Sequence, residues 1–138
     1  MKKFLIPVLL ILASCAASPN SENFVMRLDN VEFPQPVVKN LLEVPSSVTA
    51  NETIKVRLSV ALGGGCEQFG RFETKRSNTQ LEVTPIGTRQ LNLACTEIYG
   101  TKWVEFLDSA ITPRSSPFKV IIHSANGPDL ERSVSITP

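Results

Sequence analysis

The stretch that decides the fold is residues 54–62, IKVRLSVAL. Its even-numbered positions are all aliphatic, whereas its odd-numbered positions are Lys55, Arg57, Ser59 and Ala61. Successive side chains of a β-strand point to opposite faces, so this alternation places one face on an apolar core and the other in water. The stretch therefore predicts a strand in a sheet that has one covered face and one solvated face.

Similar patterns extend along the rest of the chain. Alternation is clear at 117–123 and 133–137, and weaker at 37–44, 69–76, 79–85 and 102–107. Turn-forming residues separate these runs, notably Pro45-Ser46-Ser47, Gly63-Gly64-Gly65, Ser77-Asn78, Pro85-Ile86-Gly87 and Asn126-Gly127-Pro128. Ten prolines and seven glycines argue against long helices. About seven short strands predict an all-β fold, an immunoglobulin-like β-sandwich, with a small closed barrel as the alternative.

The first fourteen residues, MKKFLIPVLLILAS, have the layout of a secretory signal peptide. Lys2 and Lys3 precede an apolar run and then small residues. The run is about half as long as a helix that crosses a bilayer. A permanent membrane-spanning helix is therefore the weaker interpretation, and we expect residues 1–14 to be removed on export.

Residues 12–15, Leu-Ala-Ser-Cys, resemble the lipobox of bacterial lipoproteins. The resemblance implies cleavage before Cys15, attachment of diacylglycerol to its thiol and acylation of the new amino group. Several acyl chains hold a protein on a membrane stably, whereas one does so only marginally. The implied location is the cell envelope, on its periplasmic or extracellular face, and Ala16 favours the outer membrane if the host has two. The alternative is a plain signal peptide, with Cys15 left as a free thiol.

The remaining chain is expected to form one domain. Residues 15–23 combine the lipid-bearing cysteine with a small, polar tether, and residues 24–138 form the β-sandwich. Formal net charge is +1, and loss of Lys2 and Lys3 from 14 basic residues leaves 12 against 13 acidic ones. Without a basic surplus, nucleic acid is not an expected partner.

Cys66 and Cys95 remain as a pair once Cys15 carries lipid. Cysteines in an oxidising compartment usually join, so we expect a structural disulfide. A redox or metal pair is the alternative. It is disfavoured because the two cysteines lack C-x-x-C spacing and the chain has a single histidine.

A looser resemblance covers residues 37–137. The order GGGCEQFGRFETKR, TQLEVTP, LACTEIYG and PFKVIIHSANG is similar to that of small immunoglobulin-like domains in bacterial envelope lipoproteins, many without assigned activity. A vaguer similarity links Gly65-Cys66-Glu67-Gln68-Phe69 to META-type lipoprotein domains. The first resemblance implies an envelope lipoprotein domain of unassigned activity.

The residues themselves suggest no catalytic grouping, cofactor or metal site. His123 falls on the polar phase of its strand and is expected to be a solvated surface side chain. Tyr99 and Trp103 suggest a sugar-stacking platform, although Trp103 is more simply explained as a core or disulfide-packing residue. We therefore expect a non-catalytic binding or scaffolding module with an envelope protein or polysaccharide as partner. The alternative is a protease inhibitor or small envelope hydrolase that acts through a loop at 86–101 or 108–117.

Overall fold

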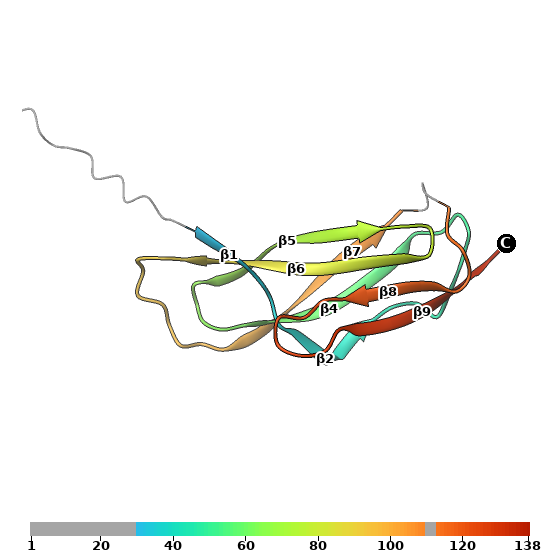
Figure 1. Cartoon of the computed structure of the whole chain (residues 1–138). Helices are drawn as coiled ribbons and strands as arrows, with labels where there is room; N and C mark the ends of the chain where they lie inside the picture. The colour runs from blue at the N-terminus through green and yellow to red at the C-terminus, as the bar shows by residue number, and fades with distance from the viewer. Residues whose placement is uncertain (1–29, 110–112) are drawn as a thin grey trace, which may run out of the picture.

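Figure 1 shows the computed structural model of the chain, which describes residues 30–109 and 113–138. The expected signal peptide at 1–14, Cys15 and the tether to residue 23 lie outside these residues, as does the start of the expected domain at 24–29. The described ranges contain no helix that is long and apolar enough to cross a membrane.

Nine strands form in the described residues, and the expectation of an all-β fold is confirmed. They are β1 (Asn30–Pro34), β2 (Val37–Glu43), β3 (Ser47–Thr49), β4 (Ile54–Leu62), β5 (Glu67–Arg76), β6 (Gln80–Gln90), β7 (Gly100–Asp108), β8 (Phe118–Ile122) and β9 (Leu130–Thr137). The seven segments expected to be strands are β2 and β4 to β9. β1 and β3 were not expected, because both are short.

The strands form two sheets that face each other as a sandwich. The larger sheet has the order β1-β6-β8-β9-β3, with β5 also paired to β6, and the smaller has the order β2-β4-β7. β6 is the longest strand and has three neighbours. β5 runs along one side of it, whereas the other side pairs with β8 over Gln80–Val83 and with β1 over Ile86–Gln90.

The change of neighbour along β6 explains one incorrect expectation. Pro85-Ile86-Gly87 was expected to be a turn but lies inside β6. Pro85 has no N–H to donate, so a position between two pairing partners suits it. It stands between the part of β6 that pairs with β8 and the part that pairs with β1. Its carbonyl accepts a hydrogen bond from the Gln35 N–H at 2.8 Å.

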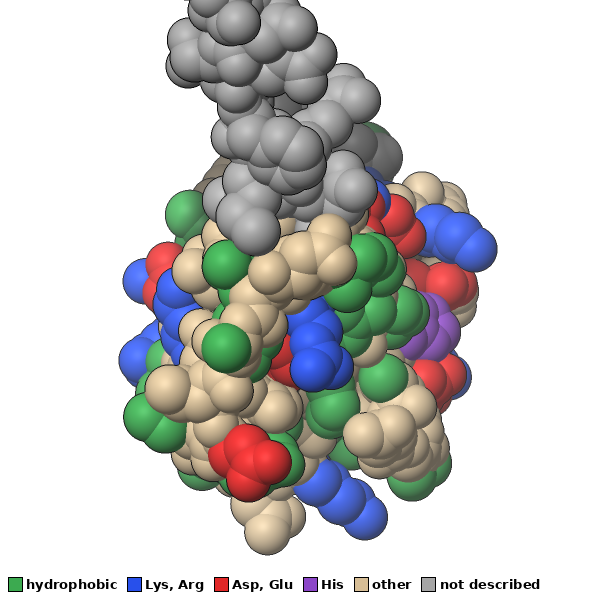
Figure 2. Space-filling view, turned by 90° about the vertical axis from the view of Figure 1, so that its left-hand side faces the viewer, with side chains coloured by type: hydrophobic (Ala, Val, Ile, Leu, Met, Phe, Trp, Pro, Cys, Tyr) green, Lys and Arg blue, Asp and Glu red, His purple; other side chains and the backbone are tan. Residues whose placement is uncertain are grey.

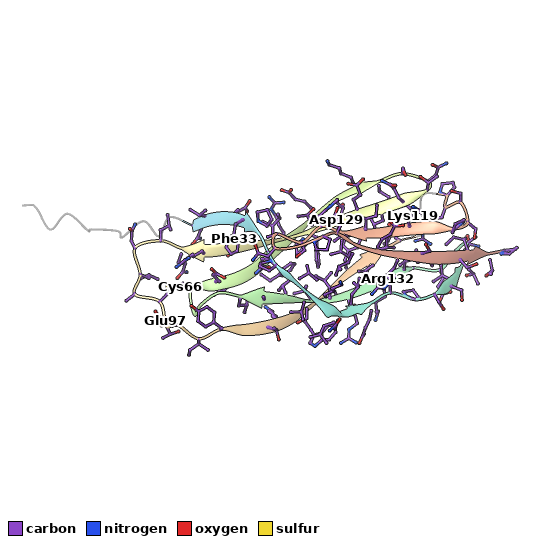
Figure 3. The ribbon with its side chains drawn as sticks, turned by 60° about the horizontal axis from the view of Figure 1, so that its bottom comes forward. Phe33, Cys66, Glu97, Lys119, Asp129 and Arg132 are labelled. Atoms are coloured by element: carbon purple, nitrogen blue, oxygen red, sulfur yellow. A yellow bond between two sulfur atoms is a disulfide. The ribbon has the colours of Figure 1, made fainter. Side chains whose placement is uncertain are left out.

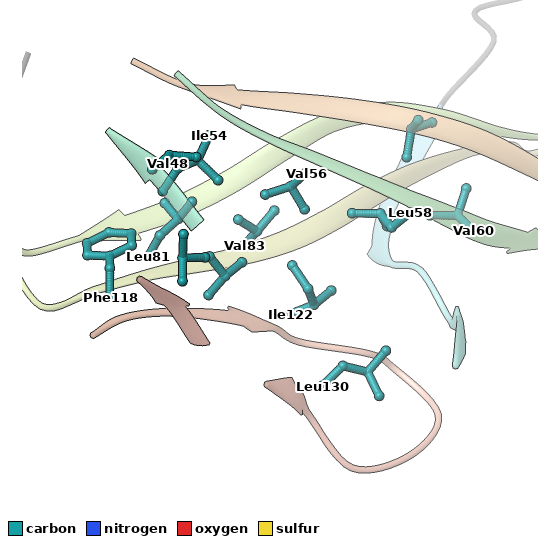
Figure 4. Close-up of a cluster of buried hydrophobic side chains, with 13 residues drawn as sticks. Val48, Ile54, Val56, Leu58, Val60, Leu81, Val83, Phe118, Ile122 and Leu130 are labelled. Atoms are coloured by element: carbon teal, nitrogen blue, oxygen red, sulfur yellow. The ribbon is translucent and has the colours of Figure 1, made fainter. Parts of the chain in front are cut away.

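The core lies between the two sheets (Figure 4). The inward side chains of β4, namely Ile54, Val56, Leu58 and Val60, are fully buried, which confirms the alternation seen in the sequence. The other core residues are Val48, Leu81, Val83, Val104, Phe118, Val120, Ile122, Leu130 and Val134. Most are β-branched, as expected for side chains that pack on a pleated surface.

The two ends of the sandwich differ. The described chain begins with β1 at the end that also carries the β4–β5 connection and the long β6–β7 loop, and the C-terminus lies at the opposite end (Figure 1). Both of those connections pass from one sheet to the other, because β4 and β7 belong to the smaller sheet and β5 and β6 to the larger.

Candidate functional site

A disulfide bond joins the two crossing connections. Cys66 lies just before β5 and Cys95 lies in the β6–β7 loop, and their Cα atoms are 5.3 Å apart. The expected Cys66–Cys95 bond is therefore confirmed. The Gly65 N–H donates to the Thr96 carbonyl oxygen at 2.8 Å, and a Cβ at Gly65 would overlap the Thr96 hydroxyl. The close approach of the two connections therefore requires glycine at this position.

We call this end of the molecule the stapled end, comprising β1, residues 63–66 and the β6–β7 loop. Because β6 continues to Gln90, the loop spans residues 91–99 and is shorter than the expected 86–101. Phe33, Cys66 and Glu97 lie together here (Figure 3). An open hollow of about 440 Å³ separates Phe33 from Tyr99, and apolar groups of Pro34, Pro36, Ala61 and Leu62 also line it.

The outer surface of the smaller sheet carries the most exposed aromatic ring of the strands. Trp103 on β7 is 41% exposed, so the expectation that it is a core residue is wrong. Val104 and Phe106 take the inward phase of β7 and leave Trp103 and Leu107 outside. The Arg57 guanidinium lies over the Trp103 ring, 5.2 Å from its centroid, which is the geometry of a cation–π contact.

Charged side chains surround this ring. Arg57 pairs with Glu43 at 2.7 Å, and Lys55 pairs with Glu105 at 3.5 Å. We call the exposed outward side chains of β4 and β7, with Glu43, the Trp103 face; its members are Glu43, Lys55, Arg57, Trp103, Glu105 and Leu107. β7 pairs only with β4 in the part of the chain that the structure describes, so its other edge is free for hydrogen bonding.

A groove extends the Trp103 face toward the other side of the molecule. It has a volume of about 660 Å³ and is lined by Lys55, Arg57 and Arg132, with Leu42 and Val44 as apolar wall. Arg57 therefore borders both the groove and the indole ring. Trp, Tyr and Arg are the residues most often found at the energetic centres of protein interfaces, and here two of them are in contact.

His123 lies between two carboxylates. Its Nε2 is 3.1 Å from Glu82 and its Nδ1 is 3.0 Å from Asp129. The hydrogen bond to Glu82, followed by that to Asp129, raises the pKa of His123 above its usual value, while partial burial opposes the rise. The same hydrogen bond from His123 lowers the pKa of Glu82. The expectation of a solvated surface side chain is confirmed only in part, because the His123 side chain is 36% exposed but paired with two carboxylates.

The His123 arrangement does not activate a nucleophile. Ser124 follows it in the chain, but the Ser124 hydroxyl accepts a hydrogen bond from the Val37 N–H at 3.0 Å. Both imidazole nitrogens face carboxylates rather than a hydroxyl. The geometry is that of an ion pair that joins β6 to the β8–β9 connection.

This ion pair gives a prediction about pH. Because the folded pKa of His123 is raised, its contribution to stability is fully present below the unfolded pKa of about 6.5 and is lost as pH rises through the folded pKa. We expect His123→Gln to reduce the fall in unfolding free energy between about pH 6 and 8. Urea denaturation of both proteins across this range measures it. Equal pH dependence in the two proteins would contradict the prediction.

No group of three or more metal-binding side chains gathers in residues 30–109 and 113–138. No protein-family model matches the chain, and neither the curated proteins nor the solved structures include a significant match.

The Trp103 face was missed from sequence because KWVEFL, residues 102–107, has apolar residues on both phases of the strand. Only the inward position of Val104 settles which side is exposed.

Proposed function

We propose that the chain is a lipid-anchored, non-catalytic cell-envelope lipoprotein that binds a partner through the Trp103 face. The observation that carries the proposal is the exposed Trp103 ring beneath Arg57, next to Leu107 on a free strand edge. Trp103 and Leu107 lie two positions before and after Glu105, and their exposed side chains offer a partner apolar area. The free edge of β7 offers it unpaired backbone groups.

The contact between Arg57 and Trp103 favours a protein over a polysaccharide as partner. A sugar ring that stacked on this indole face would have to displace the guanidinium. An acidic side chain of a protein would instead pair with Arg57 in exchange for the exposed Glu43. The partner's chemistry is therefore an apolar surface bordered by carboxylates, and an extended segment of it would add to the edge of β7.

The anchor and the fold are part of the same proposal. The lipobox-like residues 12–15 support lipid at Cys15, export and a place on the envelope membrane. Two facing sheets and the crossing of the chain from β2 in one sheet to β3 in the other support an immunoglobulin-like sandwich. The parallel pairing of β6 with β8 sets this sandwich apart from purely antiparallel members of that class.

Site-specific photo-crosslinking in cells tests the proposed face. A photoreactive amino acid replaces Trp103 or Leu107 in the full chain, and a matched control replaces Ser133, which is exposed on β9 of the larger sheet. We expect the same discrete crosslinked protein from positions 103 and 107 and none from 133. Crosslinks of equal yield from all three positions, or repeated failure at 103 and 107, would overturn the proposed face.

The same membrane extract provides the check on the anchor. We expect the intact mass of residues 15–138 plus acyl groups, rising by about two daltons when the disulfide takes up two hydrogens on reduction. A mass without lipid would overturn the anchor while leaving the crosslinking result valid. A polysaccharide partner would appear as crosslinked material that glycan-degrading enzymes, and not proteases, convert to the free protein.

A further inference from the structure

Exposed hydrophobic side chains concentrate at the stapled end. Of the seven large hydrophobic residues exposed in the described chain, two belong to the Trp103 face; the other five lie at the stapled end and are Val31, Leu91, Leu93, Ile98 and Tyr99. Ile98 and Tyr99 are the most exposed, at 69% and 73%. Figure 2, which views this end, shows hydrophobic side chains at several places among basic and acidic ones.

The loop that carries most of these side chains is held in place. The Cys66–Cys95 bond and the Gly65–Thr96 hydrogen bond fix its centre against the β4–β5 connection. Its first turn contains Asn92 in a left-handed conformation, φ 65°. A loop fixed in this way keeps its apolar side chains at the surface, and such a concentration of exposed apolar groups is typical of an interaction site.

The chain from the expected anchor arrives at the same end. β1 begins at Asn30, which pairs with Gln90 immediately before the loop. Residues 16–29 separate Cys15 from Asn30, and this length of chain spans about 50 Å at most. The opposite end of the sandwich lies farther from Asn30 by the length of β6, which is about 35 Å. The stapled end reaches the membrane with little extension of the chain, whereas the opposite end would need most of its length.

We infer that the stapled end rests on the membrane, with Leu91, Leu93, Ile98 and Tyr99 at the boundary between headgroups and acyl chains. The inference rests on the proposed lipid anchor at Cys15. Tyrosine suits this boundary because its ring is apolar and its hydroxyl is polar. This orientation directs the long axis of the sandwich away from the membrane and leaves the Trp103 face on its side, open to a partner.

The charges of the stapled end indicate how it contacts lipid. Among the described residues, β1, residues 63–66 and the β6–β7 loop carry Glu32 and Glu97 but no lysine or arginine, and the neighbouring Arg89 lies 3.7 Å from Glu67. This described part of the molecule therefore offers no basic cluster to attract anionic lipid. Contact through apolar side chains depends little on lipid charge or salt. We therefore expect it on bilayers of phosphatidylcholine alone.

A single tryptophan reports the contact, since Trp103 is the only one in the chain. In a Trp103→Phe background, Tyr99→Trp places the probe on the loop, and Asn78→Trp places a matched control in the exposed turn at the opposite end. Both full-chain proteins are extracted from membranes and reconstituted into phosphatidylcholine vesicles with brominated acyl chains. We expect strong quenching and a blue shift at position 99, several-fold more quenching than at position 78, and reduced quenching when Ile98→Asp is added.

The other results are also decisive. Equal quenching at 99 and 78, or none at 99, rules out the proposed orientation. A blue shift at 99 that is present without lipid and changes with protein concentration shows that a second copy of the chain covers the loop. Intact mass shows whether the orientation or the anchor has failed. If the protein carries lipid but is not quenched at position 99, the orientation is wrong and the lipoprotein proposal stands. If the protein carries no lipid, the lipoprotein proposal is rejected. If unlipidated protein is mixed with the vesicles, quenching at 99 alone still supports the inference, and its absence opposes it.

Discussion

Asp108→Ala is expected to lower the free energy of unfolding by about 3–5 kcal/mol, because it leaves the buried Arg114 guanidinium without its carboxylate. The Asp108 side chain at the end of β7 is 5% exposed and accepts from Arg76 at 2.7 Å and from Arg114 at 2.8 Å. Arg114 is fully buried, and it also donates to the backbone oxygens of Asp108 and Glu52.

The position of this cluster adds to the expected loss. Both guanidinium groups lie over the ring of buried Phe118, with Cζ at 5.6 Å for Arg76 and 5.9 Å for Arg114. The cluster thus ties β5 and β7, which are in different sheets, to the start of β8. Removal of the carboxylate separates these elements and leaves the charge of the buried Arg114 guanidinium uncompensated in an apolar environment.

Urea denaturation checks the prediction, with Glu131→Ala as the matched control. Glu131 pairs with Lys119 at 3.0 Å, but both side chains are about half exposed. An exposed pair contributes at most about 1 kcal/mol. A loss in Asp108→Ala no greater than that in Glu131→Ala would contradict the assigned role.

Replacement of both disulfide cysteines, Cys66→Ser with Cys95→Ser, is expected to cost about 3–4 kcal/mol. The bond closes a loop over a sequence separation of 29 residues, and the chain-entropy model gives this magnitude for such a loop. The double variant avoids an unpaired thiol. Urea denaturation of the oxidised and variant proteins measures the difference.

A second measurement localises the effect. The bond joins two connections that cross between the sheets, and the core residues lie away from them. We therefore expect limited proteolysis to cut the variant first within residues 91–99 while the strands remain protected. First cleavage within β4 or β6 would show instead that the bond holds the core together.

Sequence patterns predicted the strands well where one face packs on the core. β4 was expected over 54–62 and forms over Ile54–Leu62, because every inward position is aliphatic and every outward position but Ser59 is exposed or half-buried. The disulfide also followed from a simple count of cysteines.

Features that depend on topology could not be predicted. The second half of β6 was missed because Pro85 and Gly87 are turn-forming in isolation, and only the arrival of two different neighbours makes the proline acceptable there. Asp108 and Arg76 are 32 residues apart in sequence and meet only because their strands belong to facing sheets. Glu82 and His123 meet for the same reason, through the parallel pairing of β6 with β8.

The pairing of β3 with β9 has a consequence for the order of folding. Ser47–Thr49 lies parallel to Ser135–Thr137, and β8 and β9 supply Phe118, Val120, Ile122, Leu130 and Val134 to the core. A ribosome must therefore synthesise β8 before Gln80–Val83 of β6 find their second partner, and β9 before β3 finds its partner. Contacts between such distant residues form slowly, because long loops must close first. We therefore expect the nascent chain to complete its core only after β9 has been synthesised.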